Sequence, residues 1–474
     1  MPDPIVTTTE GLVRGRAEGG AHVFLDIPYA ATPFGAARFT APVSHAPWQG
    51  VRDASRPGPT APQPRRDGFG ALDMSPYFGP GWVPGQDYLT VNVWAPSTAR
   101  NCPVMVFVHG GGFVAGSTRS PLYDGTAFAR DDIVLVTLNY RLGITGFLDL
   151  PGAPANRGLL DVLAALRWVR GNIEAFGGDP GNVTVFGQSA GATIITGILA
   201  NPDARGLFHR AIVQSGNGLG AFTGEQAARV THAAATALGI EPTVPGFARI
   251  PDEQLIAVLP KLAGLDLRTG THCDPLVGLS PFSLVLERQP ADAVAAGAGA
   301  EVALMIGTTT EEGNLYLVPQ GNLATSTDQD VYDIAARIHA DPAALIAHHR
   351  TRRPGATPGQ LRSAILGDAL FGTGSRRLAH AHAARTSTYT YTYEFAWRST
   401  ALNGALGAAH TVELPYVFDN LPLPALHGPS GLLGDTEPPA ALAIEMHGAW
   451  VDFARTGNPG WTPPETHSFT AVPG

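Results

Sequence analysis

Short apolar runs alternate with longer amphipathic stretches along most of the chain. The apolar runs have the length of strands and the amphipathic stretches that of helices. This alternation indicates an α/β protein with a mostly parallel central sheet flanked by helices. Helices are predicted over 159–176 and 190–200, and the clearest strand candidates are 104–109, 133–139, 183–186, 211–214, 302–307 and 388–397.

Two further stretches, around 222–270 and 328–385, have an interrupted helical pattern and lie between predicted core strands. We interpret them as helical insertions that form a cap or a gorge wall. The chain holds 57 glycines and 41 prolines, but they are scattered and form no linker. We therefore expect residues 1–474 to form one domain.

The composition allows a large buried core and argues against several classes of protein. Hydrophobic residues make up 44% of the chain and charged residues 15%. The net charge is −9, and Lys261 is the only lysine, so no basic patch for nucleic acid is expected. The apolar runs are far shorter than the roughly 20 residues of a membrane helix. The N-terminus lacks the pattern of a secretory signal. These features predict a cytoplasmic protein without nucleic-acid or membrane partners, and a monomer is favoured.

No cofactor and no metal are expected. Residues 216–220 contain glycines after a predicted strand, but their spacing does not fit a dinucleotide fingerprint. His380 and His382 have no third ligand at a metal-binding spacing. We interpret both, together with His348 and His349, as surface residues of helices. Two cysteines, Cys102 and Cys273, are too few for a disulfide scaffold, and nothing requires a bridge between them.

The strongest chemical signal is the motif G-x-S-x-G at 187–191, whose centre is Ser189. It separates a predicted strand from a predicted helix, which places the serine on a strand-to-helix turn. The glycines by themselves are also compatible with an ordinary glycine-rich turn between a strand and a helix. The context favours a nucleophile, because the flanking glycines make room for a strained residue and the helix N-terminus offers free N–H groups.

A second signal is His109 followed by three glycines, directly after the predicted strand 104–109. Consecutive glycines let the backbone approach a substrate closely, and their N–H groups can bind an oxyanion. Together with the turn at the serine, this run predicts an oxyanion hole formed by the N–H groups of Gly111, Gly112 and Ala190.

A serine nucleophile needs a base and a carboxylate that orients it. His410 follows the predicted strand 388–397 through a Gly/Ala loop, and Glu311 and Glu312 follow the strand at 302–307. Both places lie at the carboxyl ends of strands, where open α/β sheets build their sites. Ser, Glu and His then occur in a known triad order. The residues themselves do not decide between the two glutamates.

Several segments resemble the type-B carboxylesterase/cholinesterase-like family of α/β-hydrolases, particularly bacterial para-nitrobenzyl-esterase-like carboxylesterases. The resemblance implies an α/β-hydrolase fold. It selects Glu312 as the acid because the family acid immediately precedes a glycine. It also supports His410, and it implies that Ser215 buttresses the triad. The similarity extends from near residue 5 to about 460, with motifs at 24–30, 38–39, 89–93, 139–143, 178–191, 214–216, 410–418 and 450–459.

The chain departs from the family pattern at three positions. Gln86 and Tyr88 stand where many relatives have an acidic residue and a cysteine. The resemblance therefore implies that Arg38 lacks its usual ion-pair partner and that no disulfide pins the segment 65–84. Asp26 occupies a position where glycine is usual.

These observations predict a serine carboxylesterase with a small-molecule ester substrate. We expect it to hydrolyse aryl and short-to-medium acyl esters through Ser189, His410 and Glu312 and an acyl-enzyme. A hydrolase of amides, carbamates or lactones with the same fold is one alternative. A catalytically silent cholinesterase-like binding protein is another, although such members typically lose the nucleophile.

Overall fold

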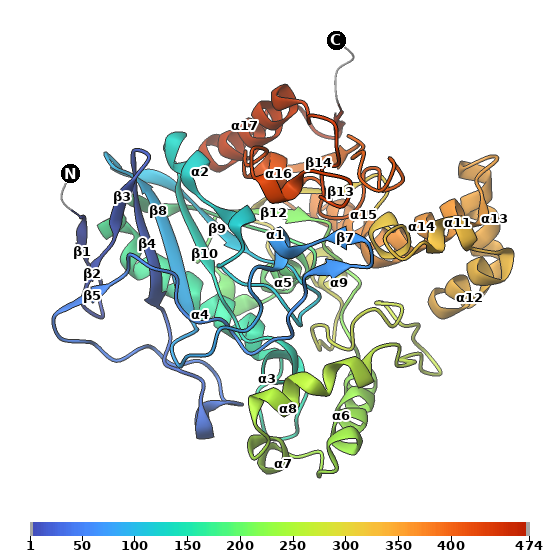
Figure 1. Ribbon diagram of the computed structural model, residues 1–474, viewed down its shortest axis with the longest axis horizontal. Helices are drawn as coiled ribbons and strands as arrows, with labels where there is room; N and C mark the ends of the chain where they lie inside the picture. Colours follow the sequence, from blue (N-terminus) through green and yellow to red (C-terminus); the bar gives the residue numbers. More distant parts are fainter. Residues whose placement is uncertain (1–2, 471–474) are drawn as a thin grey trace.

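The predicted parallel strands form the centre of a ten-stranded sheet (Figure 1). The computed structural model describes residues 3–470. The strands of this sheet are β3 (Arg16–Glu18), β4 (Ala21–Pro28), β8 (Thr90–Pro96), β9 (Cys102–Val108), β10 (Val134–Leu138), β11 (Gly178–Gln188), β12 (Arg210–Gln214), β13 (Ala303–Thr309), β14 (Thr390–Phe395) and β15 (Thr466–Phe469). Their order across the sheet is β15-β14-β13-β12-β11-β9-β10-β8-β4-β3.

Neighbouring strands from β10 to β15 are parallel. The edge formed by β3, β4 and β8 is antiparallel. All six strands predicted from the sequence form, as β9 to β14. Strands β9 to β13 are covered on both faces and have continuous apolar runs, which is why the pattern revealed them. The antiparallel edge was not predicted, and neither were β1 (Ile5–Thr7), β2 (Leu12–Arg14) and β5 (Val51–Asp53) of a separate three-stranded sheet.

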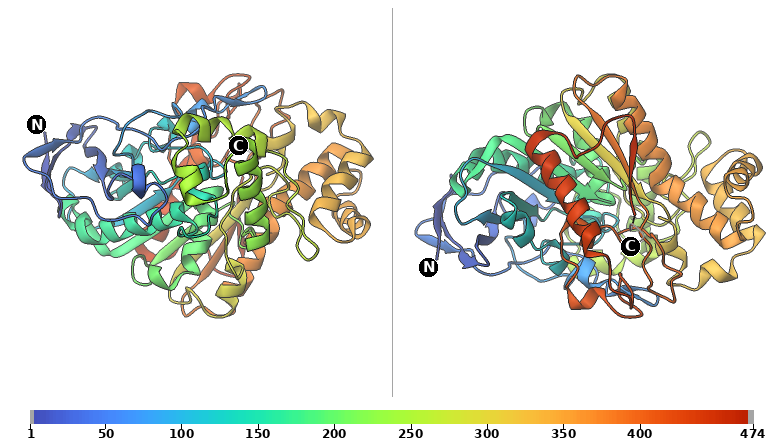
Figure 2. Two further views of the ribbon diagram at one scale, coloured as in Figure 1. Left: turned by 90° about the horizontal axis from the view of Figure 1, so that it is seen from below. Right: turned by 90° about the horizontal axis from the view of Figure 1, so that it is seen from above.

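Helices cover both faces of the large sheet (Figures 1 and 2). One face carries α2 (Thr126–Arg130) and α17 (Ala440–Thr456). The other carries α4 (Arg157–Asn172), α5 (Ala190–Leu199), α9 (Pro290–Ala295) and α15 (Thr373–Ala383). The two predicted helices correspond to α5 and to α4 with the 3-10 turn Ile173–Phe176 that extends it. No helix within residues 3–470 is long and apolar enough to cross a membrane.

The two predicted insertions are helical and lie beside the sheet as separate groups (Figure 1). The first contains α6 (Gly224–Leu238), α7 (Val244–Ala248) and α8 (Asp252–Ala257). The second contains α12 (Asp328–Ile338), α13 (Pro342–Arg352) and α14 (Pro358–Gly367), whereas α15, at the end of the predicted range 328–385, packs on the sheet. Shorter helices are α1 (Ser75–Phe78), α3 (Gly143–Phe147), α10 (Asn314–Leu317), α11 (Asn322–Thr325) and α16 (Leu414–Val417).

Two of the four histidines interpreted as surface residues are buried, so that interpretation was wrong for His349 and His382. The His382 ring nitrogens lie 2.7 Å from Thr390 Oγ1 and 3.0 Å from the Val302 carbonyl oxygen. These contacts satisfy the polar ring where α15 packs on the sheet, so the residue fills a structural position. Both cysteines are free.

The departures from the family pattern have structural explanations. Asp26 lies at an irregularity in the pairing of β4 with β8 and has a φ of 62°, a region that favours glycine. Arg38 pairs with Asp252 of α8 at 3.3 Å and donates a hydrogen bond to the Ile250 carbonyl at 2.6 Å. The arginine therefore ties its loop to the first insertion instead of to position 86.

The segment 65–84 is held without a disulfide. It contains α1 and a hairpin of β6 (Gly68–Phe69) and β7 (Leu72–Asp73). The Asp73 N–H donates to the Ser430 carbonyl at 2.8 Å, and Tyr77 Oη donates to Gln188 Oε1 at 2.9 Å. Hydrogen bonds to distant parts of the chain thus fix this segment next to the predicted nucleophile.

Candidate active site

Every predicted site residue lies just beyond the carboxyl end of a parallel strand. Ser189 follows β11, Glu312 follows β13, and His410 follows β14 after a loop. Gly111 and Gly112 follow β9. Because β9, β11, β13 and β14 run in the same direction, these segments meet at one edge of the sheet.

Ser189 occupies a sharp turn between β11 and α5, with φ 58° and ψ −124°. A side chain is rarely held in this conformation, so the surroundings must enforce it. A Cβ atom on Gly191 would lie 2.0 Å from the Val108 carbonyl oxygen, and one on Gly187 would lie 2.6 Å from the same atom. The two glycines of the motif are therefore required by the close approach of β9.

His410 and Glu312 form a buried pair in which Nδ1 lies 2.6 Å from Oε2. The other carboxylate oxygen of Glu312 accepts hydrogen bonds from Ser215 Oγ at 2.5 Å and from the Thr309 N–H at 2.8 Å. Three donors thus surround the carboxylate and fix its orientation. Ser215 contacts the pair through this hydroxyl, and its supporting role stays a prediction.

The two neighbouring glutamates have different surroundings. Glu311 forms an ion pair with Arg398 and accepts a hydrogen bond from the Ala408 N–H at 2.9 Å. Its carboxylate is partly exposed, whereas that of Glu312 is buried. The structure therefore brings Glu312, and not Glu311, to His410.

The remaining contacts of His410 come from residues that the sequence did not single out. The Phe371 ring stacks on the imidazole with centroids 4.1 Å apart, and the Tyr316 ring lies 6.1 Å away. Nε2 lies 3.2 Å from Nε2 of Gln188. Within residues 3–470, no hydrogen bond joins this histidine to Ser189. Gln188 was missed because the second position of G-x-S-x-G carries no residue preference that could have marked it.

The glycine run after β9 forms a tight loop. Gly111 and Gly112 have φ values of 115° and 64°, and a Cβ atom on Gly111 would lie 1.9 Å from the Ala115 carbonyl oxygen. In the described part of the chain, the N–H groups of these two glycines and of Ala190 donate to no protein acceptor. Ser280 Oγ donates to the Gly112 carbonyl at 2.8 Å and holds the loop in place.

His109 supports this loop through contacts of its ring and its carbonyl group. Its ring stacks on Tyr140 with centroids 4.5 Å apart, and its Nδ1 lies 2.8 Å from the Gly110 carbonyl oxygen. The hydroxyl of Tyr140 donates to the His109 carbonyl at 2.7 Å. Burial lowers the pKa of His109 to about 4, so the ring is neutral at neutral pH.

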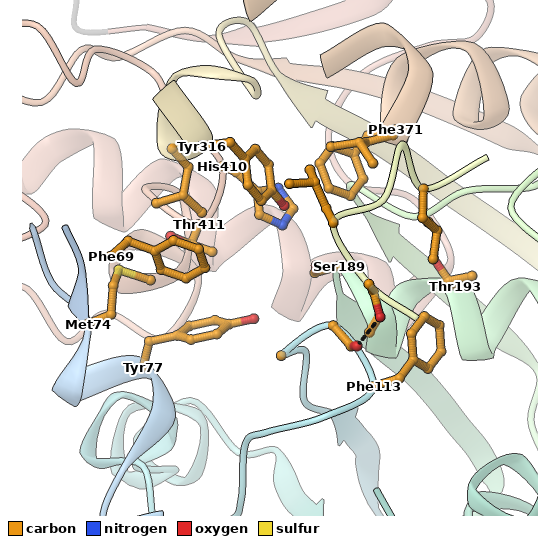
Figure 3. Close-up of a pocket in the computed structure, with 18 of the residues that line it drawn as sticks. Phe69, Met74, Tyr77, Phe113, Ser189, Thr193, Tyr316, Phe371, His410 and Thr411 are labelled. Atoms are coloured by element: carbon orange, nitrogen blue, oxygen red, sulfur yellow. Dashed lines mark hydrogen bonds between the residues drawn. The ribbon is translucent and has the colours of Figure 1, made fainter. Parts of the chain in front are cut away.

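A cavity of about 140 Å³ joins these groups, and its lining is mainly apolar. Ser189, His410 and the N–H-bearing loop all line it. Figure 3 shows Phe69 and Tyr77 on one side of this cavity, with Ser189 and Phe113 on the other. The arrangement places a serine, a histidine–glutamate pair and free N–H groups around one apolar space. These are the components of acyl-transfer chemistry.

A serine on a strand-to-helix turn at the edge of a mostly parallel sheet flanked by helices is characteristic of the α/β-hydrolase fold. The carboxylesterase family model matches residues 2–470, and the chain belongs to this family.

Relatives support the same assignment over nearly the whole chain. The para-nitrobenzyl esterase of Bacillus subtilis is 38% identical over 473 residues, which cover 97% of this chain and 91% of that protein. The phenmedipham hydrolase of Pseudarthrobacter oxydans is 35% identical over 466 residues, covering 96% and 90%. A solved carboxylesterase of Geobacillus stearothermophilus has a TM-score of 0.83 and 34% identity, covering 98% of this chain and 96% of that one. The predicted family and fold are confirmed, and the protein is a carboxylic ester hydrolase.

Proposed function

We propose that the protein is a serine carboxylesterase in which Ser189, His410 and Glu312 act as the catalytic triad. The observation that carries this proposal is the buried contact of 2.6 Å between His410 Nδ1 and Glu312 Oε2, beside a cavity that Ser189 also lines. A carboxylate at Nδ1 keeps that nitrogen protonated and leaves Nε2 unprotonated, so that Nε2 can act as the base.

In the acylation step, Ser189 Oγ attacks the ester carbonyl carbon while His410 Nε2 accepts the hydroxyl proton. The carbonyl oxygen becomes an oxyanion that the N–H groups of Gly111, Gly112 and Ala190 bind. Each such donor contributes about 10²- to 10³-fold to the rate. The C–O bond to the alcohol then breaks, and His410 returns the proton to the leaving oxygen.

Deacylation repeats the same steps with water as the nucleophile. His410 accepts a proton from water, and the hydroxyl oxygen attacks the acyl carbon. The bond to Ser189 Oγ then breaks to release the carboxylic acid, and His410 returns the proton to Ser189 Oγ. Glu312 stabilises the charged imidazolium in both halves of the reaction. Every step uses side chains and backbone N–H groups of the described chain.

Aryl esters and short-to-medium acyl esters are the proposed substrates. The cavity of about 140 Å³ is lined largely by apolar and aromatic side chains, which suit small aromatic or aliphatic groups. The name of the Bacillus subtilis relative, para-nitrobenzyl esterase, supports aromatic esters.

The test is hydrolysis of 4-nitrophenyl acetate and butyrate by matched variants. Ser189→Ala should lower kcat/KM by at least about 10⁴-fold because it removes the nucleophile. Glu312→Gln should lower it by roughly 10²- to 10⁴-fold. Glu311→Gln, the same change one residue earlier, should stay within about threefold of wild type. Full activity of Ser189→Ala, or equal losses for the two glutamate variants, would overturn the assignment.

A further inference from the structure

The active-site cavity has one formally charged side chain in its wall that the proposed mechanism does not use. Among the residues that line the cavity in the described chain, Arg66 is the only arginine, lysine, aspartate or glutamate. The side chain is half-buried, and its neighbours in the wall are chiefly aromatic and aliphatic. A cation costs free energy in such a place unless something compensates its charge.

No carboxylate in the described part of the chain pairs with this arginine. Within residues 3–470, Arg66 has neither an ion pair nor a hydrogen bond through its side chain. The acidic residue next in sequence, Asp67, is already bound by Arg65, whose Nε lies 2.8 Å from Oδ2. The contact that remains is the Phe78 ring, whose centroid lies 5.8 Å from the Arg66 guanidinium carbon. Burial lowers the pKa of Arg66, but a guanidinium remains charged at neutral pH.

An aromatic wall leads from Arg66 toward the proposed base. The Phe78 ring lies 6.1 Å from Phe69, and Phe69 lies 6.2 Å from Tyr316. Tyr316 in turn lies 6.1 Å from His410. In an acyl transfer the leaving alcohol receives its proton from the base, so the alcohol part of the ester lies next to His410. Arg66 therefore stands on the wall along which that alcohol part extends.

We propose that Arg66 binds an anionic group, most simply a carboxylate, on the alcohol part of the ester substrate. This inference rests on the proposed function and narrows its substrate class to esters of carboxylate-bearing alcohols and phenols. A carboxylate fits the fork of a guanidinium with two parallel hydrogen bonds. The net charge of −9 repels an anionic ester, and the pairing with Arg66 offsets this repulsion at the active site.

The test compares two esters that differ in charge but hardly in shape: 4-acetoxybenzoate and 4-acetoxybenzamide. We expect Arg66→Gln to lower the ratio of kcat/KM for the benzoate to that for the benzamide by about 10- to 100-fold. Arg66→Lys keeps the positive charge, so its ratio should lie between that of Arg66→Gln and that of wild type. The double variant Arg65→Gln/Asp67→Asn is the matched control, because it removes the neighbouring, exposed guanidinium together with the carboxylate that it binds, and it should leave the ratio within about twofold of wild type.

Two outcomes would overturn the inference in distinguishable ways. If Ser189 is needed for hydrolysis of both esters but Arg66→Gln leaves their ratio unchanged, Arg66 is only a cation packed on Phe78, and the proposed function stands. If neither ester is hydrolysed in a Ser189-dependent manner, the proposed function fails and the inference fails with it. Unfolding curves of Arg66→Gln and of the double variant Arg65→Gln/Asp67→Asn show whether a lower ratio reflects a loss of the folded state.

Discussion

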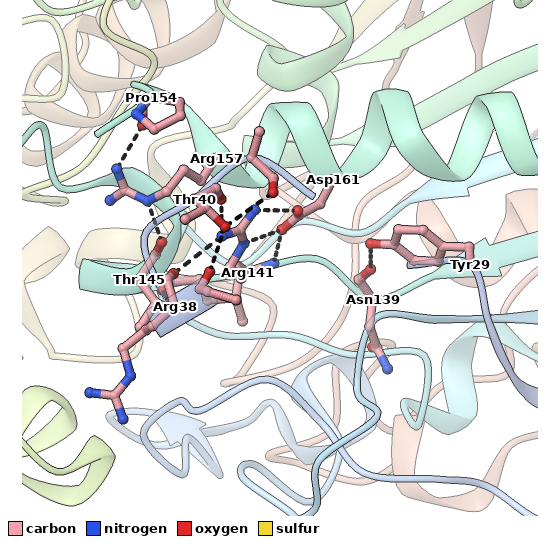
Figure 4. A network of polar contacts seen from close by, with 12 residues as sticks. Tyr29, Arg38, Thr40, Asn139, Arg141, Thr145, Pro154, Arg157 and Asp161 are labelled. Atoms are coloured by element: carbon pink, nitrogen blue, oxygen red, sulfur yellow. Dashed lines mark hydrogen bonds and ion pairs between the residues drawn. The ribbon is translucent and has the colours of Figure 1, made fainter. Parts of the chain in front are cut away.

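Replacing Asp161 by asparagine should strongly destabilise the protein. Asp161 of α4 and Arg141, which follows β10, are both completely buried and form a two-pronged ion pair (Figure 4). Arg141 Nε donates to Oδ2 at 2.8 Å and an Nη donates to Oδ1 at 2.7 Å. A second buried arginine, Arg157, lies nearby, donates to four backbone carbonyls and lies 5.3 Å from the centroid of the Phe39 ring. The Asp161 carboxylate is therefore the charge paired with Arg141, and together with Asp149 it also stabilises the charge of Arg157.

The magnitude follows from the burial of the pair. Breaking a buried ion pair by removing one partner costs about 3–5 kcal/mol, because the remaining charge stays buried without compensation. An exposed pair of the same geometry provides the control. Asp266 accepts hydrogen bonds from Arg268 Nε at 2.9 Å and from an Nη at 2.6 Å, yet about half of each side chain is exposed to solvent. Removing an exposed pair costs about 0–1 kcal/mol.

Equilibrium urea unfolding at pH 7, followed by tryptophan fluorescence and by circular dichroism, compares Asp161→Asn with Asp266→Asn. We expect Asp161→Asn to lose at least about 2 kcal/mol more of the free energy of unfolding than Asp266→Asn. If the two substitutions cost the same, the reasoning from burial is wrong.

Three further substitutions probe groups near the site and at the sheet edge. Ser215→Ala removes the hydroxyl donor to Glu312 and should lower kcat about tenfold with little change in KM, as steady-state kinetics would show; an unchanged kcat would contradict this role. Burial raises the pKa of Glu413 to about 8, so folding favours its protonated form and stability falls as pH rises from about 4.5 to 8. In Glu413→Gln, the loss of unfolding free energy between pH 5 and pH 8 should therefore be roughly 3 kcal/mol smaller than in wild type, and an equal loss would refute the pKa shift. Asp26→Gly relieves a φ of 62° and removes a carboxyl whose pKa burial raises to about 6, so it should stabilise the protein by about 1 kcal/mol at pH 8. A lower thermal midpoint for this variant would show that the contact with Arg52 outweighs both effects.

The predictable part of the fold was the part in which burial is uniform along a strand. Strands β9 to β13 are covered on both faces and stand out as apolar runs. The short strands β1 and β2 have mostly exposed positions and only a few residues each, so periodicity gives too little signal. His382 shows a second limit, because its polar ring is buried by tertiary contacts with Thr390 and Val302 that helical spacing does not reveal.

The predictable part of the site was the part that backbone geometry imposes on the sequence. Gly187 and Gly191 are required by the approach of β9, so the turn at Ser189 left a local signature. Spacing could not choose between Glu311 and Glu312, because that choice depends on which carboxylate meets a histidine nearly 100 residues away. The walls of the cavity come from segments far apart in the chain, and no local pattern brings them together.

The central claim, that Ser189 is the nucleophile, is tested most directly by covalent labelling. The enzyme would be treated with diethyl 4-nitrophenyl phosphate, and intact mass and peptide mapping would count and locate the adducts. We expect one diethylphosphoryl group, on Ser189, with complete loss of esterase activity and no adduct in Ser189→Ala. An adduct on another residue that abolishes activity, or an active enzyme that resists labelling, would contradict it.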